Sequence, residues 1–492
     1  MPKDYFSVSG SASLTQLLPG ARIHVIGVAG VAMAQLAIVL SEQGFNVSGS
    51  DKAFYEPMGS LLRASRVKLF EGYDAANLNG DLALVVIGNV VSYGHPEVEE
   101  VERRELPYSI FPKLLFESLI AGRHSVVASG THGKTTTSAL CATALEVLGA
   151  HPSYFIGGAA LDLPKSLQIG NGNISVVEGD EYDSVFFAKI PKFSFYKPDT
   201  AIVTSIEYDH ADIYPDLAAI NAQFSAMIMA MPAGSSAICC IDGANARQLV
   251  DLWRRDAKCS IISYGSYPTA DAQIVNIQER PGSQLVSVHL PDSGRETTFE
   301  LQIPGRHNAT NALAVFLALH GRGFEIAAIG QALAKFRGVR RRQDVRFDRN
   351  GITVIDDFAH HPTAVSETLA ALARRYSGRK LWAVFEPRSN TSRLQVFQSQ
   401  YVAAFGHSQR VVLSNVQARS VDDQENLLDV TELAQQISDR GTPAIALPGA
   451  EAIAKHLLDN VREGDVVVIM SNGSFDGLVE RVVKGLGGLI SA

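Results

Sequence analysis

The 492-residue chain has few of the features that mark secreted, membrane-spanning or nucleic-acid-binding proteins. Its four cysteines lack the spacing of metal ligands or of a redox pair, which indicates structural thiols in a reducing compartment. The most apolar stretch, residues 82–91, is too short to span a bilayer, and residues 1–10 lack the pattern of a signal peptide. The net charge of -8 argues against general binding of nucleic acid or of an anionic membrane. We therefore expect a cytoplasmic protein without those partners, and the charge still allows an anionic small-molecule substrate.

The length of the chain predicts about three domains. Strand-like and helix-like segments alternate, which indicates α/β domains with mainly parallel sheets flanked by helices. We place the domains at residues 1–122, 123–338 and 339–492. Polar and apolar residues alternate over residues 268–303, which predicts an additional antiparallel sheet in the second domain. Further strands are expected at residues 22–27, 45–49, 84–87, 174–177, 201–205, 352–355, 381–385 and 466–470, and helices before residue 40 and at residues 308–319.

The segment at residues 126–137, VVASGTHGKTTT, predicts a phosphate-binding loop. An apolar strand ends at Gly130, and a helical pattern begins near Lys134. The backbone N–H groups of such a loop and of the helix N-terminus attract an anion. The lysine supplies a charge for the terminal phosphates, and Thr135 supplies a hydroxyl for Mg²⁺. The match is not strict, because Ala128 stands where the standard P-loop has its first glycine, and a glycine turn without a nucleotide is the alternative.

Polar side chains also follow two other expected strands of the second domain. Glu178 ends the strand ISVVE, and ligands of parallel sheets bind beyond the carboxyl ends of strands. A carboxylate there, beside a P-loop, is a natural Mg²⁺ ligand, whereas the acids that follow it in EGDEYD can equally form a solvated loop. His210 follows the strand AIVTS and can hold a second metal ion, with an ordinary surface or core position as the alternative.

Two clusters lie near the end of the second domain. Asn308 and Asn311 share one face of an expected helix and can read the edge of a base, although helix capping by Asn308 is the alternative. Five arginines then occur within residues 337–346, at the expected domain boundary. They can form a solvated basic face, or an arginine among them can reach a transferring phosphoryl group.

The first domain opens with a glycine turn, GVAGVAM, at residues 27–33. It resembles a dinucleotide-binding fingerprint in which Ala29 and Ala32 replace two glycines, and Asp51 stands where a ribose-binding acid would lie. Taken alone, this turn indicates a nicotinamide dehydrogenase. A close-packed turn without a ligand is the alternative.

Three expected strands of the third domain end in polar loops, DDFAHHP, EPRSNTS and SNGSF. The carboxyl ends of parallel strands meet at one edge of a sheet, so these loops predict a site at that edge. In the first loop, Pro362 is expected to begin a helix. Loop and capping roles can explain any single one of these sequences.

Together these motifs resemble the Mur ligase family, the ATP-dependent amide-forming enzymes of peptidoglycan assembly. The resemblance extends from about residue 22 to the C-terminus. GTHGKTTT is similar to the family's variant P-loop, which accounts for the missing glycine, and EGDEYD, EYDHADIY, GRHNATNALA and DDFAHHPTAV add to it. Within the family, the glycine turn and His132 resemble members that use UDP-N-acetylmuramate. EPRSNT, GSD and MSNGSF resemble the branch that rejoins a recycled tripeptide to that sugar nucleotide.

The resemblance implies a Rossmann-like first domain that binds the UDP-sugar, a P-loop central domain that binds ATP, and a Rossmann-like third domain that binds the amine. The implied cofactors are ATP and Mg²⁺, and the implied substrates are UDP-N-acetylmuramate and the murein tripeptide L-Ala-γ-D-Glu-meso-diaminopimelate. An alternative is the UDP-N-acetylmuramate–L-alanine ligase, which tends to have an arginine where this chain has Ser389. A distant alternative is an NAD(P)-dependent dehydrogenase. A monomer or weak homo-oligomer is expected.

The resemblance also assigns roles to matched positions. Lys134, His132, Arg342 and His210 are the implied catalytic residues, and Arg342 would meet the transferred phosphate. Asp357 would contact ATP from the third domain. The implied ATP contacts are Gly130, Thr131, His132, Gly133, Lys134, Thr135, Thr136, Asn308, Asn311, Arg342 and Asp357; the metal ligands are Thr135, Glu178 and His210; the substrate contacts are Gly27, Gly30, Asp51, His361, Arg388, Ser389 and Asn390.

Overall fold

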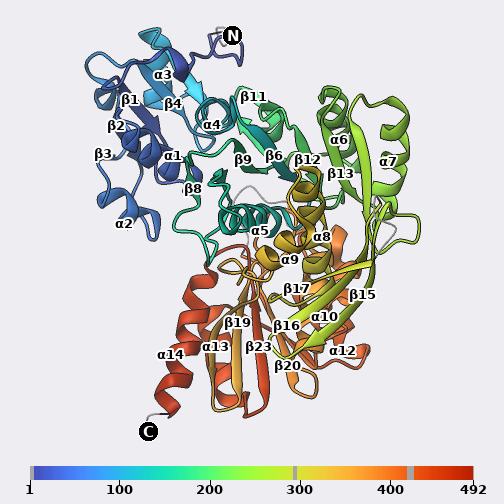
Figure 1. Ribbon diagram of the computed structural model, residues 1–492. Coiled ribbons are helices and arrows are strands. Elements are labelled where there is room, and N and C mark those ends of the chain that lie inside the picture. The colour runs from blue at the N-terminus through green and yellow to red at the C-terminus, as the bar shows by residue number, and fades with distance from the viewer. Residues whose placement is uncertain (1–4, 292–295, 418–425, 491–492) are drawn as a thin grey trace.

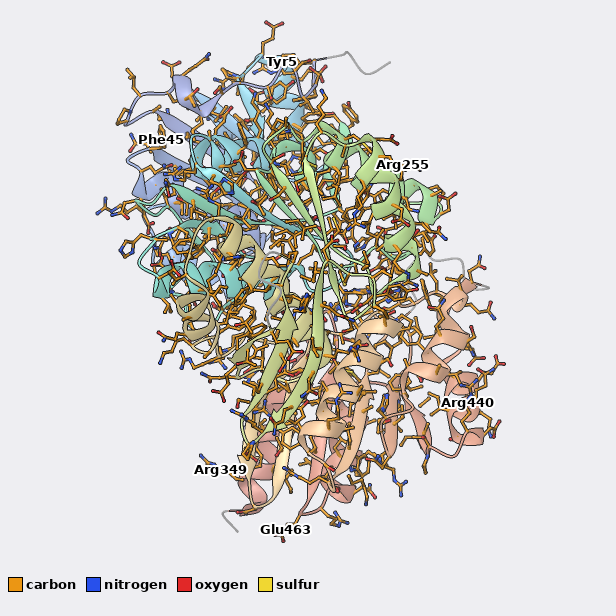
Figure 2. All side chains as sticks on the ribbon, turned by 45° about the vertical axis from the view of Figure 1, so that its right-hand side comes forward. Tyr5, Phe45, Arg255, Arg349, Arg440 and Glu463 are labelled. Atoms are coloured by element: carbon orange, nitrogen blue, oxygen red, sulfur yellow. The ribbon has the colours of Figure 1, made fainter. Side chains whose placement is uncertain are left out.

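The computed structural model describes residues 5–291, 296–417 and 426–490. Three main sheets follow one another along the chain, which confirms the expected α/β architecture. The first sheet (blue) and the third (orange and red) lie at opposite ends of the molecule, with the central sheet between them (Figure 1). Figure 2 shows the same arrangement, with Tyr5 and Phe45 near one end and Arg349 and Glu463 near the other. Within the described residues, no helix has the length and apolar character that crossing a membrane requires.

The first sheet has five parallel strands in the order β3-β2-β1-β4-β5. The glycine turn follows β1, at the point where the strand order reverses, which is where α/β sheets bind ligands. All four residues of β4, LVVI, are buried, as expected for a parallel strand covered on both faces. The elements are β1 (Arg22–Ile26), α1 (Val31–Glu42), β2 (Asn46–Asp51), α2 (Met58–Arg63), β3 (Lys68–Glu71), β4 (Leu84–Ile87), α3 (Pro96–Arg103), β5 (Tyr108–Ile110) and α4 (Phe111–Leu115).

A buried polar cluster lies between β1, β2 and α3. The carboxylate of Glu97 accepts hydrogen bonds from Ser50 Oγ at 2.5 Å and from Asn77 Nδ2 at 2.7 Å, and it lies 3.9 Å from His24 Nε2. Neither His24 nor Glu97 has any exposed surface. Burial alone would raise the pKa of Glu97, but the interactions with His24, Ser50 and Asn77 outweigh burial and lower it.

We expect Glu97→Ala to destabilise the protein by about 3 kcal/mol at pH 7, because it leaves buried polar groups without their acceptor. Since the pKa of Glu97 is lower in the folded chain, its contribution is complete above the unfolded value of about 4.3 and is lost as the pH falls below it. Thermal unfolding from pH 7 to pH 3 measures this, and the difference from the parent should shrink on acidification. A difference that stays constant over this range would contradict the assignment. The exposed Glu99 on the same helix supplies the control, Glu99→Ala.

The central sheet has ten strands in the order β17-β16-β15-β14-β13-β12-β6-β9-β7-β8. The P-loop strand β6 lies between β9 and β12, so the ends of these three strands meet at one edge. The predicted antiparallel region is confirmed as β15–β17, although residues 292–295 of that stretch lie outside the described residues. The strands are β6 (His124–Ser129), β7 (Ser153–Phe155), β8 (Leu167–Gln168), β9 (Ile174–Gly179), β12 (Thr200–Val203), β13 (Ser236–Cys240), β14 (Ser260–Gly265), β15 (Ala272–Arg280), β16 (Ser283–His289) and β17 (Glu296–Leu301).

Two largely buried helices, α5 and α8, pack against each other in the central domain. Their small and apolar residues allow this close packing, and α5 is thereby fixed with its N-terminus at the P-loop. The helices of this domain are α5 (Lys134–Val147), α6 (Leu217–Ala230), α7 (Ala244–Asp256), α8 (Arg306–Gly321) and α9 (Ile326–Leu333).

A short hairpin, β10 (Asp183–Val185) and β11 (Ala188–Pro191), joins the central domain to the first. The ring centroids of Phe186 and Phe187 at its tip lie 5.8 and 5.5 Å from that of Phe6. Val185 and Ala188 belong to the same buried cluster as β5 of the first domain. This apolar contact fixes the first domain beside the P-loop strand.

The third sheet has six strands in the order β18-β19-β23-β20-β21-β22. Only the pairing of β18 with β19 is antiparallel among the pairs of this sheet in the described residues. The elements are β18 (Asp344–Arg349), β19 (Ile352–Asp357), α10 (Pro362–Arg375), β20 (Lys380–Phe385), α11 (Gln398–Ala404), β21 (Arg410–Ser414), α12 (Val430–Asp439), β22 (Ala444–Leu447), α13 (Ala450–Asn460), β23 (Asp465–Met470) and α14 (Leu478–Ile490).

The chain passes from the central to the third domain through a short connection before β18. Val339 forms an isolated bridge with Ala160, and the Arg340 N–H donates to Ala159 O at 2.9 Å. Arg341 and Gln343 then have φ values of 60° and 52°, in the left-handed region. The connection is therefore fixed to the central domain as far as Arg340 and turns sharply before the third domain begins.

Candidate active site

The P-loop runs from the end of β6 to the start of α5, as the sequence predicts. Gly130 and Gly133 have φ values of 128° and 84°, which glycine adopts readily. A β-carbon would lie 2.3 Å from Thr204 Oγ1 at the first glycine, and 2.8 Å from Asn311 Oδ1 at the second. Gly133 is the N-cap of α5, and no side chain of the described residues caps this end of the helix. The first N–H groups of α5 are thus available to an anion.

Lys134, the first residue of α5, is held by an acid that sequence reasoning left as part of a solvated loop. Its Nζ lies 2.8 Å from Glu181 Oε2 and donates to Gly130 O at 2.7 Å. Burial would lower the pKa of Lys134, but the charges of Glu181 and Asp180 outweigh burial and raise it. The lysine is therefore a cation that Glu181 and the backbone of the P-loop hold in place.

His210 contacts the same acid. Its Nε2 lies 2.9 Å from Glu181 Oε1, and burial, which would lower its pKa, is outweighed by this hydrogen bond and the acid's charge, which raise it. Glu181 has an exposed fraction of only 3% and so lies between the lysine and the histidine. The structure therefore places His210 inside the P-loop network and not at the surface, which leaves the core alternative open.

Glu178, at the end of β9, contacts the residue after the P-loop lysine. Thr135 Oγ1 donates to Glu178 Oε1 at 3.0 Å, and the Gly157 N–H donates to Oε2 at 2.8 Å. A β-carbon on Gly157 would lie 2.7 Å from Oε2, so this close approach requires glycine. Burial raises the pKa of Glu178, which means that its ionised form would gain from a bound cation. A hydroxyl and a carboxylate this close form a suitable oxygen pair for Mg²⁺.

The arginines at the domain boundary separate into two groups. Four have acidic partners: Arg337 with Asp162, Arg340 with Asp344, and Arg341 and Arg346 with Asp356.

Arg342 differs from those four. Its guanidinium lies 4.7 Å above the ring of Phe358, and burial lowers its pKa despite the charges of Asp357 and Glu178. The predicted solvated face therefore does not describe Arg342, which lies at the junction of the two domains.

Asp357 ends β19 and faces the same junction. Its Oδ2 accepts a hydrogen bond from the Gln343 N–H and its Oδ1 accepts one from the Ala359 N–H, both at 2.7 Å. Burial raises the pKa of Asp357, which the Arg342 charge only partly offsets. The side chain thus fixes the interdomain connection and the start of the DDFAHHP loop at once.

A second contact across the domains involves His132 of the P-loop. Its Nε2 lies 3.2 Å from Nδ1 of His361, the N-cap of α10, and 3.5 Å from Glu207 Oε2. Glu207 also lies 3.6 Å from His361 Nδ1. Sequence reasoning named both histidines but missed the glutamate, although it lies in the quoted motif EYDHADIY.

The EPRSNT loop of the third domain also reaches the central domain. Asn390 Nδ2 donates to Asp212 Oδ2 at 2.8 Å, whereas Ser389 Oγ accepts a hydrogen bond from the Ser392 N–H within the loop. Arg388 Nη1 lies 3.6 Å from Glu386 Oε1. These three predicted substrate residues therefore lie together, next to the segment that carries His210.

The two predicted base-reading asparagines are buried in α8. Asn308 Nδ2 donates to Pro304 O at 2.7 Å, and the helix N-cap is Gly305, so the predicted capping alternative is wrong. Asn311 lies against Gly133, as described above. Asn311 is thus next to the P-loop, whereas the side chain of Asn308 is hydrogen-bonded to the backbone before α8.

In the first domain, Asp51 supports the glycine turn. Its Oδ2 accepts a hydrogen bond from the Ala29 N–H at 2.8 Å, and its Oδ1 accepts one from Tyr73 Oη at 3.0 Å. Gly27 has a φ of 77°, and Gly30 is the N-cap of α1. The acid thus lies at the predicted strand end, and its observed partners belong to the protein itself.

The residues that sequence reasoning missed are Glu181, Glu207 and Gly157. Glu181 and Glu207 lie inside the quoted motifs, three residues from Glu178 and His210, and Gly157 belongs to the glycine pair of FIGGAA, but nothing in a single sequence ranks one acid above its neighbours. Their partners come from segments distant in the chain, so only the fold identifies them.

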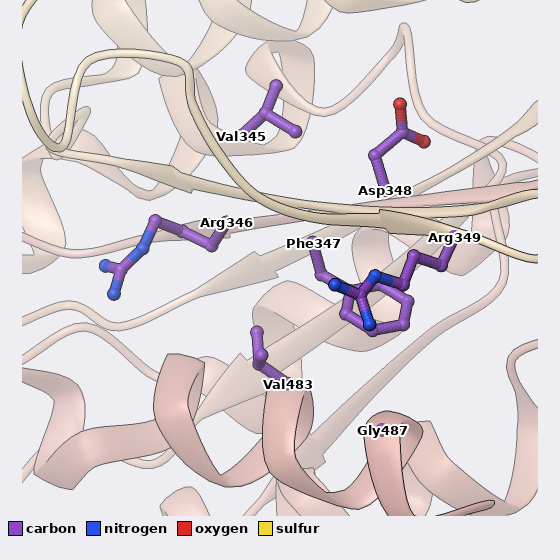
Figure 3. Close-up of a pocket in the computed structure, with 7 residues that line it drawn as sticks. All are labelled: Val345, Arg346, Phe347, Asp348, Arg349, Val483 and Gly487. Carbon is purple, nitrogen blue, oxygen red and sulfur yellow. The ribbon is translucent and has the colours of Figure 1, made fainter. Parts of the chain in front are cut away.

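A hollow of about 410 Å³ lies elsewhere, between β18 and α14 of the third domain (Figure 3). It is lined by Val345, Phe347, Val483 and Gly487 together with the polar side chains of Arg346, Asp348 and Arg349. It contains none of the predicted site residues, so we do not associate it with the site above.

Comparison with known proteins matches all three domains to one family. The model described as Mur ligase family, catalytic domain matches residues 22–121. The Mur ligase middle domain matches residues 128–319, and the Mur ligase, glutamate ligase domain matches residues 340–473. Together these matches cover most of the chain.

Individual relatives match nearly the full length. The UDP-N-acetylmuramate–L-alanyl-gamma-D-glutamyl-meso-2,6-diaminoheptandioate ligase of Escherichia coli K12 is 33% identical over 470 residues, covering 94% of this chain and 98% of that protein. The UDP-N-acetylmuramate–L-alanine ligase of Mycolicibacterium vanbaalenii is also 33% identical, over 92% and 93% of the two chains. A solved murein peptide ligase from Psychrobacter arcticus is 29% identical, with a TM-score of 0.70 over 95% of this chain and 99% of that one.

Proposed function

The chain belongs to the Mur ligase family, whose members form amide bonds with ATP, and on that premise we propose that it joins a tripeptide to UDP-N-acetylmuramate. The tripeptide is L-Ala-γ-D-Glu-meso-diaminopimelate, the product is an amide, and the process is peptidoglycan recycling. We assign residues 1–122 to the UDP-sugar, residues 123–338 to ATP and residues 339–492 to the peptide. A cytoplasmic location and a monomer or weak homo-oligomer remain predictions.

One observation carries the reaction class: the start of α5 with Lys134 and Thr135, the end of β9 with Glu178, and the interdomain connection with Arg342 face one junction. Two cations and an oxygen pair in one place suit a polyphosphate with its metal ion. The glycines of the P-loop keep side chains away from the anion's position. The residues present therefore fit ATP and Mg²⁺.

Bound ATP with Mg²⁺ would supply a phosphoryl group that activates the muramyl carboxylate as an acyl phosphate. In our proposal Lys134 and the N–H groups of α5 neutralise the phosphate oxygens, and Arg342 neutralises the group in transfer. Thr135 and Glu178 would hold the metal ion, and His210 would hold a second one. The remaining ATP contacts of the P-loop, Asn308, Asn311 and Asp357 stay part of the proposal.

The amine of the peptide then attacks the acyl carbon, and phosphate leaves. The protein's own contribution is alignment of two anionic reactants and exclusion of water, which would hydrolyse the acyl phosphate. His132 lies beside the P-loop lysine in sequence and faces the third domain, so we assign it to the carboxylate. Contacts between the third and central domains through Asn390 and His361 favour this closed arrangement.

Gly27, Gly30 and Asp51 are assigned to the UDP-sugar. The hydrogen bond from the Ala29 N–H to Asp51 favours an indirect role for the acid, which would shape the turn for the diphosphate. We do not propose the dehydrogenase alternative, since the family matched along the chain is a ligase family.

The choice of amine separates the proposal from its rival. The 33% identity to the E. coli tripeptide ligase and Ser389 in the EPRSNT loop favour the tripeptide. Relatives that add L-alanine are as similar in overall identity, so the third-domain residues His361, Arg388, Ser389 and Asn390 carry the specificity in our proposal.

Phosphate release with UDP-N-acetylmuramate and ATP tests this choice. We expect the tripeptide to give a kcat/KM at least about 100-fold above that of L-alanine. The smaller amine would leave the protein groups that hydrogen-bond the rest of the peptide without partners. Reactions without either amine supply the background of ATP hydrolysis. Turnover of L-alanine equal to or better than that of the tripeptide would overturn the proposal.

A further inference from the structure

Two histidines and a glutamate converge between the central and third domains. His132 belongs to the P-loop, Glu207 follows β12, and His361 caps α10. His361 is buried, with an exposed fraction of 4%, and the side chains of His132 and Glu207 are partly buried. One ligand atom from each lies within 4.8 Å of the other two.

The distances among these three atoms match the edges of a metal tetrahedron. They are 3.2 Å from His132 Nε2 to His361 Nδ1, 3.5 Å from His132 Nε2 to Glu207 Oε2, and 3.6 Å from His361 Nδ1 to Glu207 Oε2. Zinc–nitrogen and zinc–oxygen bonds of about 2.0–2.2 Å place tetrahedral ligands about 3.4 Å apart. Three corners are thus in place, and a fourth would be open to water or another ligand.

The contacts around the three residues support ligation. His361 Nε2 lies 3.2 Å from Tyr208 O, which can only accept a hydrogen bond, so Nε2 carries the proton. Nδ1 is then unprotonated, and its lone pair can bind a metal ion. Thr363 Oγ1 donates to Glu207 Oε2 at 2.6 Å and orients the carboxylate. The Thr363 N–H also donates to His361 Nδ1, at the long distance of 3.3 Å, and an ion would replace that weak cap.

We propose that His132, Glu207 and His361 form a site for a divalent transition-metal ion, represented by Zn²⁺. Two imidazoles and one carboxylate suit zinc, whereas Mg²⁺ prefers oxygen ligands. The site shares no residue with the proposed Mg²⁺ ligands. An ion here would link the P-loop to the third domain and so hold the two domains together.

Zinc binding to the full chain tests this site. Zn²⁺ is titrated against a chromophoric chelator with excess Mg²⁺ present and without nucleotide or substrates, so the result does not depend on the proposed reaction. We expect His361→Asn and Glu207→Gln to weaken binding on the order of 100-fold. The first variant keeps a residue able to cap α10, and the second keeps an acceptor for Thr363.

Two other histidines provide the controls. His151 is exposed beside Glu146, and His210 contacts Glu181, so neither belongs to the proposed ligand set. His151→Gln and His210→Gln should therefore leave zinc affinity within about twofold of the parent. Unchanged affinity in His361→Asn and Glu207→Gln, or an equal loss in His210→Gln, would overturn the proposal.

Cobalt(II) gives a readout on the unmodified chain. We expect the strong visible absorption of a four-coordinate ion, and zinc should displace it. A weak six-coordinate spectrum would overturn the proposed site. Because this measurement uses the unmodified chain, it does not depend on whether the variants fold.

Discussion

Replacement of Lys134 by alanine is expected to lower tripeptide ligation by at least about 10³-fold, the scale seen for groups that neutralise a transferring phosphoryl group. The ammonium is the largely buried cation of the P-loop, and its hydrogen bonds to Gly130 O and Thr131 O hold it where we propose that the terminal phosphates bind. Product formation and phosphate release with all substrates present measure the loss.

Two further variants make this result specific. Lys165→Ala removes the same charge from an exposed pair with Glu42 and should leave activity unchanged. Lys134→Ala also removes a cationic partner of the buried Glu181 and leaves it with His210, so the double variant with Glu181→Gln removes the under-compensated charge and should stay inactive. Activity within tenfold of the parent in Lys134→Ala and in the double variant would refute the role of the lysine.

Arg342→Ala is expected to reduce kcat on the order of 10³-fold with a smaller change in the KM for ATP, because its charge matters most during transfer. Arg342→Lys should recover little, since the ammonium cannot reproduce the planar guanidinium on Phe358. Steady-state kinetics with varied ATP measure both values.

Arg340 offers a matched control in the same connection. Its side chain has an exposed fraction of 57% and pairs with Asp344, so Arg340→Ala should change kcat by no more than about twofold. Equal losses in the two alanine variants would show that the connection, rather than the buried charge, governs the rate.

The core of the fold could be predicted because buried parallel strands give continuous apolar runs. The strand at Leu84–Ile87 was predicted with its observed bounds, and that at residues 466–470 begins one residue earlier, at Asp465. The hairpin β10–β11 and the edge strand β18 were not predicted. The two hairpin strands are short and β18 is half-exposed, so none of them gives a continuous apolar run, and tertiary contacts decide their structure.

The candidate site shows the same division. Gly130, Lys134 and Glu178 could be predicted because strand ends and glycine turns place them locally. Glu181 and Glu207 could not, since each gains its position through partners far away in the sequence, such as Lys134 and His361. Asp51 was placed correctly at a strand end, but its contact with the Ala29 N–H depends on the exact fold of the turn.

The connection before β18 has an evolutionary consequence. Because pairing with the central domain ends at Arg340 and β18 begins at Asp344, Arg342 lies in the only covalent path between the two domains. A recombination event between residues 342 and 344 would replace the whole third sheet and keep that arginine. If the third domain recognises the amine as proposed, lineages could exchange that part while inheriting Lys134, Thr135, Glu178 and Arg342 together.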